Sequence, residues 1–245
     1  PFTMDTLHTI LSAGDWICYI ILLPCVCYLL FYAVASRFYR PARYPETTER
    51  KRFAVLFPAY RADKVILSSV RSFQQQDYPA SRYDIIVIAD HMEEATCEEL
   101  RSAGAQVLVA TYRNSSKAKA LTLAMHSIHV QMYDMVVIMD ADNTATPYLL
   151  RELNKAATAG IRAIQAHRTA KNLNTDIALL DAASEEINNG IFRKGHVAVG
   201  FSCALIGSGM AIEAEWFARH VEKLQTAGED KELEVLLQRE RIYVE

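Results

Sequence analysis

The sequence predicts an α/β protein in which a mainly parallel sheet carries helices on both faces, preceded by one transmembrane helix. Three observations predict this fold class: a long apolar run near the N-terminus, short apolar stretches that alternate with helical patterns after it, and polar residues where several of those stretches end. Alternating strands and helices form βαβ units, whose strands run parallel between two layers of helices. With 245 residues, 51% of them hydrophobic, one main domain is expected.

The apolar run covers residues 16–35 and contains no charged residue. As a helix this run would span about 30 Å, the thickness of the hydrocarbon core of a bilayer. A buried core helix is the alternative, but such helices are rarely apolar on every face over this length. A cleaved signal peptide fits less well, because no basic residue precedes the run. We therefore expect a transmembrane helix, which Pro24 would kink.

The charges beside this run predict its orientation. Arg37, Arg40 and Arg43 follow it, and basic residues gather on the cytoplasmic side of membrane helices, so the downstream domain is expected on the cytoplasmic face. Because the chain starts at Pro1 and ends as a strand begins, the main domain is expected to be incomplete at its C-terminus. The expected divisions are an N-terminal segment 1–15, a transmembrane helix 16–36, a basic linker 37–52 and a catalytic domain 53–245.

The remaining elements follow from apolar spacing. Strands are expected at 53–60, 83–90, 105–111, 133–142 and 162–170. Apolar positions three or four apart predict helices between and after them, at 65–76, 95–104, 116–130 and 147–160. Beyond residue 175 the pattern is less regular and predicts helices at 175–195, 214–224 and 230–241, a Gly-interrupted strand at 204–212, and the start of a strand at 242–245.

Charge and cysteine content narrow the class of function. A net charge of −3 gives no electrostatic basis for nucleic-acid binding, so no nucleic-acid partner is expected. Cys18, Cys25 and Cys27 lie in the apolar run, and Cys97 and Cys203 lack CxxC or histidine spacing. Neither a zinc site nor a disulfide framework is indicated.

Two carboxylates, Asp140 and Asp142, follow the apolar stretch that ends at Met139. They are consistent with a cap and Asx turn before the helix that begins at Pro147. They are also consistent with a cation site, because like charges at the mouth of a sheet repel each other unless something neutralises them. Mg²⁺ and Mn²⁺ are usually held by one or two carboxylates and substrate phosphates. Local pattern leaves both interpretations open.

Four further residues carry polar groups that a cap or a solvated side chain would also explain. Asp90 ends the strand 83–90, at the sheet edge expected to hold Asp140. Lys117 lies in the first turn of a helix, where the macrodipole disfavours cations, which indicates a phosphate partner. Glu229 and Asp230 start another helix, and their surroundings do not separate a cap from a catalytic carboxylate.

Six motifs taken together resemble the family 2 glycosyltransferases, which are inverting enzymes of the Rossmann-like GT-A fold. They are "FPAYRAD", "VIAD", "SSKAKAL", "VIMDADN", "GSGMAI" and "GEDKELEVLL", in the family's order and approximate spacing. The resemblance covers residues 53–245. The N-terminal membrane helix is similar to that of the membrane-integrated members, which include cellulose, hyaluronan and poly-N-acetylglucosamine synthases.

The resemblance implies a donor site on the first three strands. Pro58, Ala59 and Tyr60 would line the nucleotide pocket, Asp90 would contact the uracil or ribose, and Lys117 would lie near the phosphates. The usual "PAYNE" motif reads "PAYRA" here, which removes the nucleotide contact made by its Glu.

The resemblance also implies metal, acceptor and base positions. Asp140 and Asp142 would be the DxD motif, Asp140 on the ribose side and both touching a divalent metal, Mg²⁺ or Mn²⁺, with Asp142 the more direct ligand. Asp230 would be the catalytic base, in a "TED" motif that reads "GED" here. The "QxxRW" motif of processive synthases would fall beyond residue 245. The acceptor site would be formed by Gly207, Ser208, Gly209 and Glu229.

The expected function is metal-dependent transfer, with inversion, of a sugar from a nucleotide sugar, expected to be a UDP sugar, to a polysaccharide or oligosaccharide. A polyprenyl phosphate acceptor is the alternative within this chemistry, so the acceptor partner is a glycan or a lipid-linked one. A sugar-phosphate nucleotidyltransferase would have a Gly-rich loop after the first strand, and "FPAYRADK" contains no Gly. A non-catalytic nucleotide-binding membrane partner would not need four carboxylates at these positions.

Overall fold

The computed structural model describes residues 4–245, so residues 1–3 of the expected N-terminal segment lie outside it. One six-stranded sheet organises the chain after residue 52, with strand order β3-β2-β1-β4-β6-β5. Its strands pair in parallel except that β6 runs antiparallel to both β4 and β5. The predicted mainly parallel sheet is therefore confirmed. The strands are β1 Phe53–Tyr60, β2 Tyr83–Asp90, β3 Gln106–Ala110, β4 Met135–Ile138, β5 Ala163–Gln165 and β6 Met210–Glu213.

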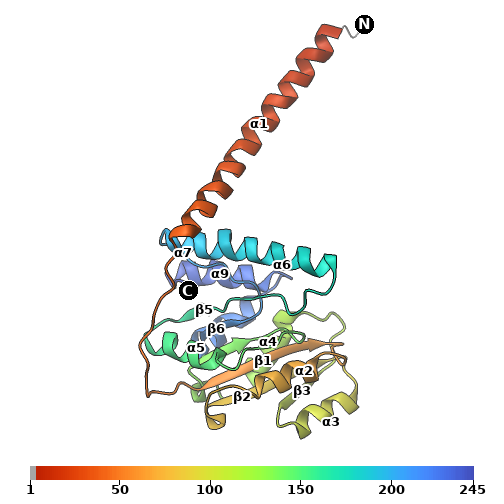
Figure 1. Ribbon diagram of the computed structural model, residues 1–245. Coiled ribbons are helices and arrows are strands. Elements are labelled where there is room, and N and C mark those ends of the chain that lie inside the picture. The colour runs from red at the N-terminus through yellow and green to blue at the C-terminus, as the bar shows by residue number, and fades with distance from the viewer. Residues whose placement is uncertain (1–3) are drawn as a thin grey trace.

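Helices cover both faces of the sheet, as predicted (Figure 1). Successive strand residues point to opposite faces, so β1 sends Leu56 to one core and Phe57 to the other. The first core is closed by α4, α8 and α9, and the second by α2, α3 and α5. The helices are α2 Ile66–Phe73, α3 Glu94–Ser102, α4 Lys117–Ser127, α5 Leu149–Thr158, α8 Ala214–His220 and α9 Glu229–Arg239.

Three expected strands prove shorter than the sequence pattern indicates. The stretch expected at 133–142 forms only β4, because the backbone turns at Asp140, whose carbonyl oxygen accepts a hydrogen bond from the backbone N–H of Asn143. The stretch at 162–170 forms only β5 and then leaves the sheet as a loop. Of 204–212 only the end joins β6, and 242–245 contributes a single bridge between Val244 and Ala163.

The N-terminal helix α1 (Met4–Ala35) projects away from the domain (Figure 1). Residues 8–38 are long and apolar enough to cross a membrane, with a mean hydropathy of 2.4 over the best window, only 6% of which is buried. This stretch contains the expected span 16–36. Pro24 lies inside the helix, where its missing N–H weakens the ladder without ending it.

The last turns of α1 pack against a continuous helical segment formed by α6 (Asp176–Asn188), the π-helical η4 (Asn189–Gly195) and α7 (His196–Ala198). The expected helix 175–195 therefore exists but changes its hydrogen-bond pattern at residue 189. The Tyr28 hydroxyl lies 3.0 Å from His196 Nε2, and Tyr32 is buried. A Cβ on Gly195 would lie 2.5 Å from the carbonyl oxygen of Tyr32, so only glycine permits this close approach.

Candidate functional site

Parallel pairing brings the polar strand ends to one edge of the sheet. Tyr60 is the register partner of Asp90, and Leu56 of β1 pairs with Ile138 of β4. The backbone N–H of Met139 then donates to the Leu56 carbonyl at 2.9 Å, which aims the following Asp140 at the same edge. Polar residues from β1, β2 and β4 thus converge at the carboxyl edge, where α/β sheets bind ligands.

A cavity of about 380 Å³ lies over the ends of β1 and β2. Five of the residues expected to bind the donor line it, and they are Pro58, Ala59, Tyr60, Asp90 and Lys117. The sequence analysis did not single out the other lining residues, Ser115, Ser116 and Ala120. Ser116 caps α4, since its Oγ accepts a hydrogen bond from the backbone N–H of Lys119 at 3.3 Å, so the cavity lies beside a helix N-terminus.

Asp90 is only 4% exposed and is held by several donors. Its Oδ1 lies 2.6 Å from His91 Nδ1 and accepts a hydrogen bond from the backbone N–H of Tyr112 at 3.3 Å. Burial alone would raise the pKa of Asp90, but hydrogen bonds from Ser115 and His91 outweigh it and hold that pKa below its ordinary value. The carboxylate is therefore charged and fixed in direction at neutral pH.

Lys117 joins three segments that lie far apart in the sequence. Its Nζ donates to Asp140 Oδ1 and to the carbonyl oxygen of Gly207, both at 2.6 Å, and lies 3.4 Å from Glu229 Oε1. Glu229 is buried, whereas Lys117 and Asp140 are partly exposed. We call Lys117, Asp140, Gly207 and Glu229 the lysine cluster. In this cluster one cation faces two carboxylates at the edge of the donor cavity.

Gly207, Ser208 and Gly209 form the loop before β6 and contact the DxD turn directly. The Ser208 hydroxyl accepts hydrogen bonds from the backbone N–H of Asp140 at 2.9 Å and from Asn143 Nδ2 at 2.7 Å. Gly207 and Gly209 have positive φ angles of 80° and 66°, which residues other than glycine adopt only with strain. This loop is largely buried, with Ser208 only 1% exposed, and it supports the DxD turn from the inside.

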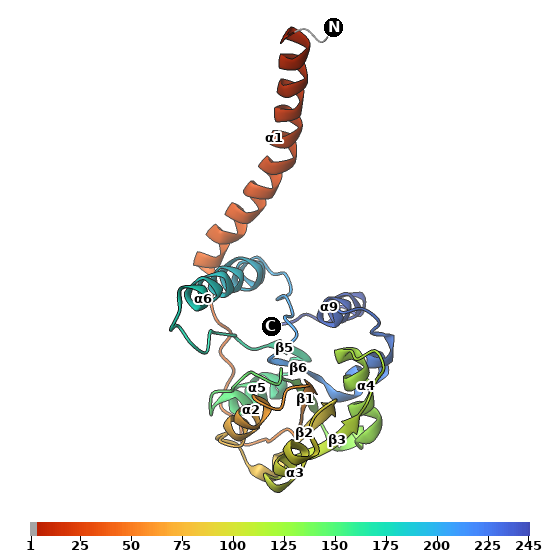
Figure 2. The ribbon, with the colours of Figure 1, turned by 90° about the vertical axis from the view of Figure 1, so that its right-hand side faces the viewer.

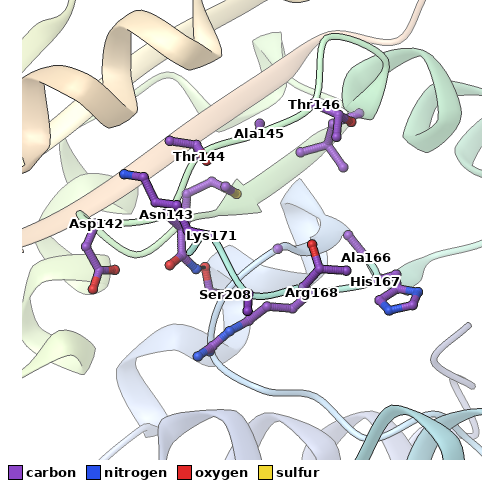
Figure 3. Close-up of a pocket in the computed structure, with 15 residues that line it drawn as sticks. Asp142, Asn143, Thr144, Ala145, Thr146, Ala166, His167, Arg168, Lys171 and Ser208 are labelled. Atoms are coloured by element: carbon purple, nitrogen blue, oxygen red, sulfur yellow. Dashed lines mark hydrogen bonds between the residues drawn. The ribbon is translucent and has the colours of Figure 1, made fainter. Parts of the chain in front are cut away.

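A second cavity, of about 310 Å³, lies on the other side of that turn (Figure 3). Asp142 lines it together with His167, Arg168 and Lys171 from the loop after β5. Figure 3 shows the Arg168 side chain extending past Ser208 toward the side occupied by Asp142. Three groups able to carry positive charge and one carboxylate thus line the same cavity, although His167 already lies 2.9 Å from Glu186. Arg168 and Lys171 make the cavity suited to an anionic ligand. The sequence analysis missed all three groups because they follow β5 without a recognisable motif.

The donor set near Asp142 fits a divalent cation that is shared with substrate. Asp142 is exposed and has no ion pair within the part of the chain that the structure describes, whereas one oxygen of Asp140 is paired with Lys117. Residues 4–245 contain no group of three or more His, Cys, Asp or Glu that could hold a metal ion by themselves. Mg²⁺ and Mn²⁺ commonly take one or two carboxylates and complete their shells with substrate phosphates and water, which is what this edge offers.

Glu229 and Asp230 start α9, as expected, and face different surroundings. Glu229 belongs to the lysine cluster. Asp230 is half-buried in the first turn, and its Oδ1 accepts a hydrogen bond from the backbone N–H of Lys231 at 2.9 Å. Across residues 4–245 Asp230 has no ion pair, so its carboxylate is open to a proton donor from outside the chain.

The fold and the site define a class: an α/β protein of the GT-A type, with carboxylates and a lysine gathered at the carboxyl edge of its sheet. Residues 50–243 match the model of the glycosyltransferase like family 2, and the chain belongs to that family. A search of curated proteins gave no match.

Solved structures show the same fold. The mannosyltransferase PcManGT from Pyrobaculum calidifontis, in complex with GDP-Man and Mn²⁺, is 20% identical with a TM-score of 0.59 over 78% of this chain and 53% of its own. Glucosyl-3-phosphoglycerate synthase from Mycobacterium tuberculosis, with Mn²⁺, UDP and phosphoglyceric acid, is 18% identical with a TM-score of 0.54 over 79% and 67%. TarS from S. aureus is 13% identical with a TM-score of 0.52 over 74% and 53%. The match thus spans about half the length of the PcManGT chain and of the TarS chain, which comprises residues 1–349.

Proposed function

We propose that this protein transfers a sugar, with inversion, from a nucleotide sugar to a carbohydrate acceptor and needs a divalent metal. The observation that carries the proposal is the lysine cluster, which links the donor cavity to the cavity containing Asp142. A nucleotide sugar has a nucleoside, a diphosphate and a sugar in a row. A nucleoside cavity, a cation and a carboxylate-bearing cavity in the same order would accommodate those three parts.

In the proposed donor complex the nucleoside lies in the cavity formed by Pro58, Ala59 and Tyr60, with Asp90 accepting hydrogen bonds from the uracil or ribose. Lys117 lies at the diphosphate, and Asp140 lies on the ribose side. Of the neighbours named above, PcManGT holds GDP-Man and glucosyl-3-phosphoglycerate synthase holds UDP. We infer a UDP sugar for this chain.

In the proposed reaction the acceptor hydroxyl loses its proton to Asp230 as its oxygen attacks the anomeric carbon. A positioned base of this kind is worth about 10² to 10⁴ in rate. The bond from the anomeric carbon to the diphosphate breaks on the opposite face, so the configuration inverts, and Lys117 faces the developing negative charge. Asp142, with Asp140 beside it, would hold a divalent cation, which would supply Lewis-acid stabilisation of the leaving diphosphate.

For the acceptor, we propose a polysaccharide or oligosaccharide placed against Gly207, Ser208, Gly209 and Glu229. The cavity with His167, Arg168 and Lys171 favours a second candidate, an acceptor that carries a phosphate, such as a polyprenyl phosphate. The proposed layout keeps a membrane helix at 16–36, a linker at 37–52 and a catalytic domain at 53–245 on the cytoplasmic face. The wide apolar surface of α1 supports this layout.

The test incubates membranes containing the full-length protein with a panel of radiolabelled nucleotide sugars and Mn²⁺ or Mg²⁺. Sugar transfer is expected with one of the donors. In Asp230→Asn the rate of transfer should fall about 10² to 10⁴ fold, while donor binding persists. Asp142→Asn is expected to abolish the metal dependence of donor binding. Asp181→Asn, which removes an exposed carboxylate from α6, is the matched control and should retain full activity.

Two results would count against the proposal. Unchanged release of nucleoside diphosphate in Asp230→Asn would exclude that residue as the base. No turnover with any donor would favour a nucleotide-binding membrane partner without catalysis.

A further inference from the structure

We propose that α6 lies in the membrane surface and buries its outer apolar side chains among lipids. The inference rests on the proposed membrane span of α1, and it concerns a surface that the proposed chemistry does not use.

The large apolar residues of α6 are exposed, and Leu179, at 50%, lies off the side that the other three share. Ile177 is 80% exposed, Leu180 72% and Ile187 59%. Their spacing of three and seven residues places them on one side of the helix, and we call them the outer stripe. No residue of α6 itself is buried. A helix of a water-soluble domain normally turns its apolar side inward, so this orientation is reversed.

Polar residues of the same helical segment make its contacts with the domain. Asn189 is 2% exposed, and its Nδ2 donates to the carbonyl oxygen of Arg168 at 3.0 Å. Glu186 Oε1 lies 2.9 Å from Nε2 of His167, which belongs to the loop after β5. These contacts fix the rotation of the segment about its axis. The outer stripe therefore cannot turn inward without breaking them.

The position of α6 identifies the bilayer as the occupant of this surface. In both views α6 lies at the foot of α1 and crosses its direction (Figures 1 and 2). The segment that continues α6 contacts the last turns of α1 through Tyr28 and Tyr32. If α1 crosses the bilayer, those turns are at the boundary between lipid tails and headgroups. The outer stripe is then at the level where amphipathic helices insert their apolar side by about 5–10 Å.

The charges on α6 indicate that apolar burial, rather than attraction to anionic lipids, drives this contact. Asp176 and Asp181 are exposed, Glu185 is paired with Arg193 of the same helical segment, and Glu186 is paired with His167 of the domain. The loop from Arg168 to Lys171 lines the second cavity and leads directly into this helix. An acceptor held in the membrane plane would thus reach the cavity without leaving the lipid surface.

The test places a nitroxide label at single cysteines of the full-length chain in phosphatidylcholine vesicles, after the five native cysteines have been replaced. Labels at Leu180→Cys and Ile187→Cys should collide with oxygen several-fold more often than with a water-soluble nickel complex. Ala182→Cys, a partly exposed position on the side of α6 opposite the outer stripe, should show the reverse. Leu22→Cys in the middle of α1 reports separately whether α1 lies in lipid. The unfolding temperature of each labelled chain checks its fold, and Ile177→Cys provides a third position on the stripe.

Labels at 180 and 187 that meet the nickel complex freely, while the label at 22 meets oxygen, would overturn the inference and leave the membrane span intact. Labels at 180 and 187 that meet neither reagent would also overturn it, because the stripe would then be covered by protein. A label at 22 that meets the nickel complex would refute the span itself, and the inference with it.

Discussion

Replacing Lys117 by Met tests whether the lysine cluster holds the catalytic edge together. Methionine keeps the length of the side chain and removes the charge. The change leaves Asp140 and the buried Glu229 facing each other without a cation and leaves the Gly207 carbonyl without a donor. A hydrogen bond to a charged group contributes about 1.5–3 kcal/mol. Because water reaches Lys117 and Asp140, we expect a net loss of about 1–3 kcal/mol in the free energy of unfolding.

The assay is thermal unfolding of the full-length protein in one detergent, followed by near-ultraviolet circular dichroism. In a chain of this length each kcal/mol lowers the unfolding temperature by roughly 2–4 °C. The matched control is Lys119→Met, because Lys119 is exposed in the same turn of α4, where its Nζ donates to the Asn114 carbonyl and lies 5.8 Å from the centre of the Tyr112 ring. Within residues 4–245 it has no ion pair with a carboxylate. That substitution should change stability by less than about 0.5 kcal/mol.

A second substitution separates an electrostatic effect from lost packing. Adding Glu229→Gln to Lys117→Met removes one of the two uncompensated carboxylates, so part of the lost stability should return. Equal unfolding temperatures for Lys117→Met and Lys119→Met would refute this reasoning. So would a double variant that is less stable than Lys117→Met alone.

Two further predictions concern the junction with α1 and alkaline pH. Gly195→Ala should loosen α1 from the domain, because its Cβ would lie 2.5 Å from the Tyr32 carbonyl oxygen, and should speed protease cleavage of the linker after α1. The control is Gly190→Ala, which has no atom within 4 Å of its added Cβ and should not speed this cleavage. Equal cleavage rates for the two variants would contradict the proposed contact. Burial raises the pKa of Tyr78 to about 12, so the stability that its protonated form contributes is present below its ordinary pKa of 10 and is lost as pH rises toward 12. The unfolding temperature should therefore fall less steeply between pH 10 and 12 in Tyr78→Phe than in the unsubstituted protein. The control is Tyr243→Phe at an exposed tyrosine, which should behave like the unsubstituted protein. Parallel curves for all three proteins would exclude Tyr78 as a source of this pH dependence.

The sequence predicted best where a strand is buried on both faces. The bounds of β1 and β2 agree with the expected 53–60 and 83–90, because β1 is apolar along nearly its whole length and β2 has five apolar residues in a row at 85–89. Expected lengths were wrong for β4, β5 and β6, each of which has three or four residues. Such short strands depend on their partners in the sheet, and a local pattern does not record those partners.

The candidate site follows the same division. Individual positions such as Asp90, Asp140 and Lys117 could be chosen from strand ends, a helix start and a family resemblance. Their mutual contacts could not be predicted, because the lysine cluster joins residues up to 112 positions apart through the packing of α9 against the sheet. Arg168 and Lys171 lie in a loop whose position depends on β5 and β6, so no local signal marked them.

The reversed direction of β6 determines which part of the chain can reshape the catalytic edge. In a parallel strand the residues after the strand reach this edge, but β6 brings the residues before it, with Ile138 opposite Met210 and Ser208 two residues earlier. A slip of one residue in this pairing would turn Met210 toward the other face and carry the Ser208 hydroxyl away from the Asp140 amide. Insertions before β6 would therefore act on the chemistry, whereas insertions after its last residue would lie at the opposite edge of the sheet.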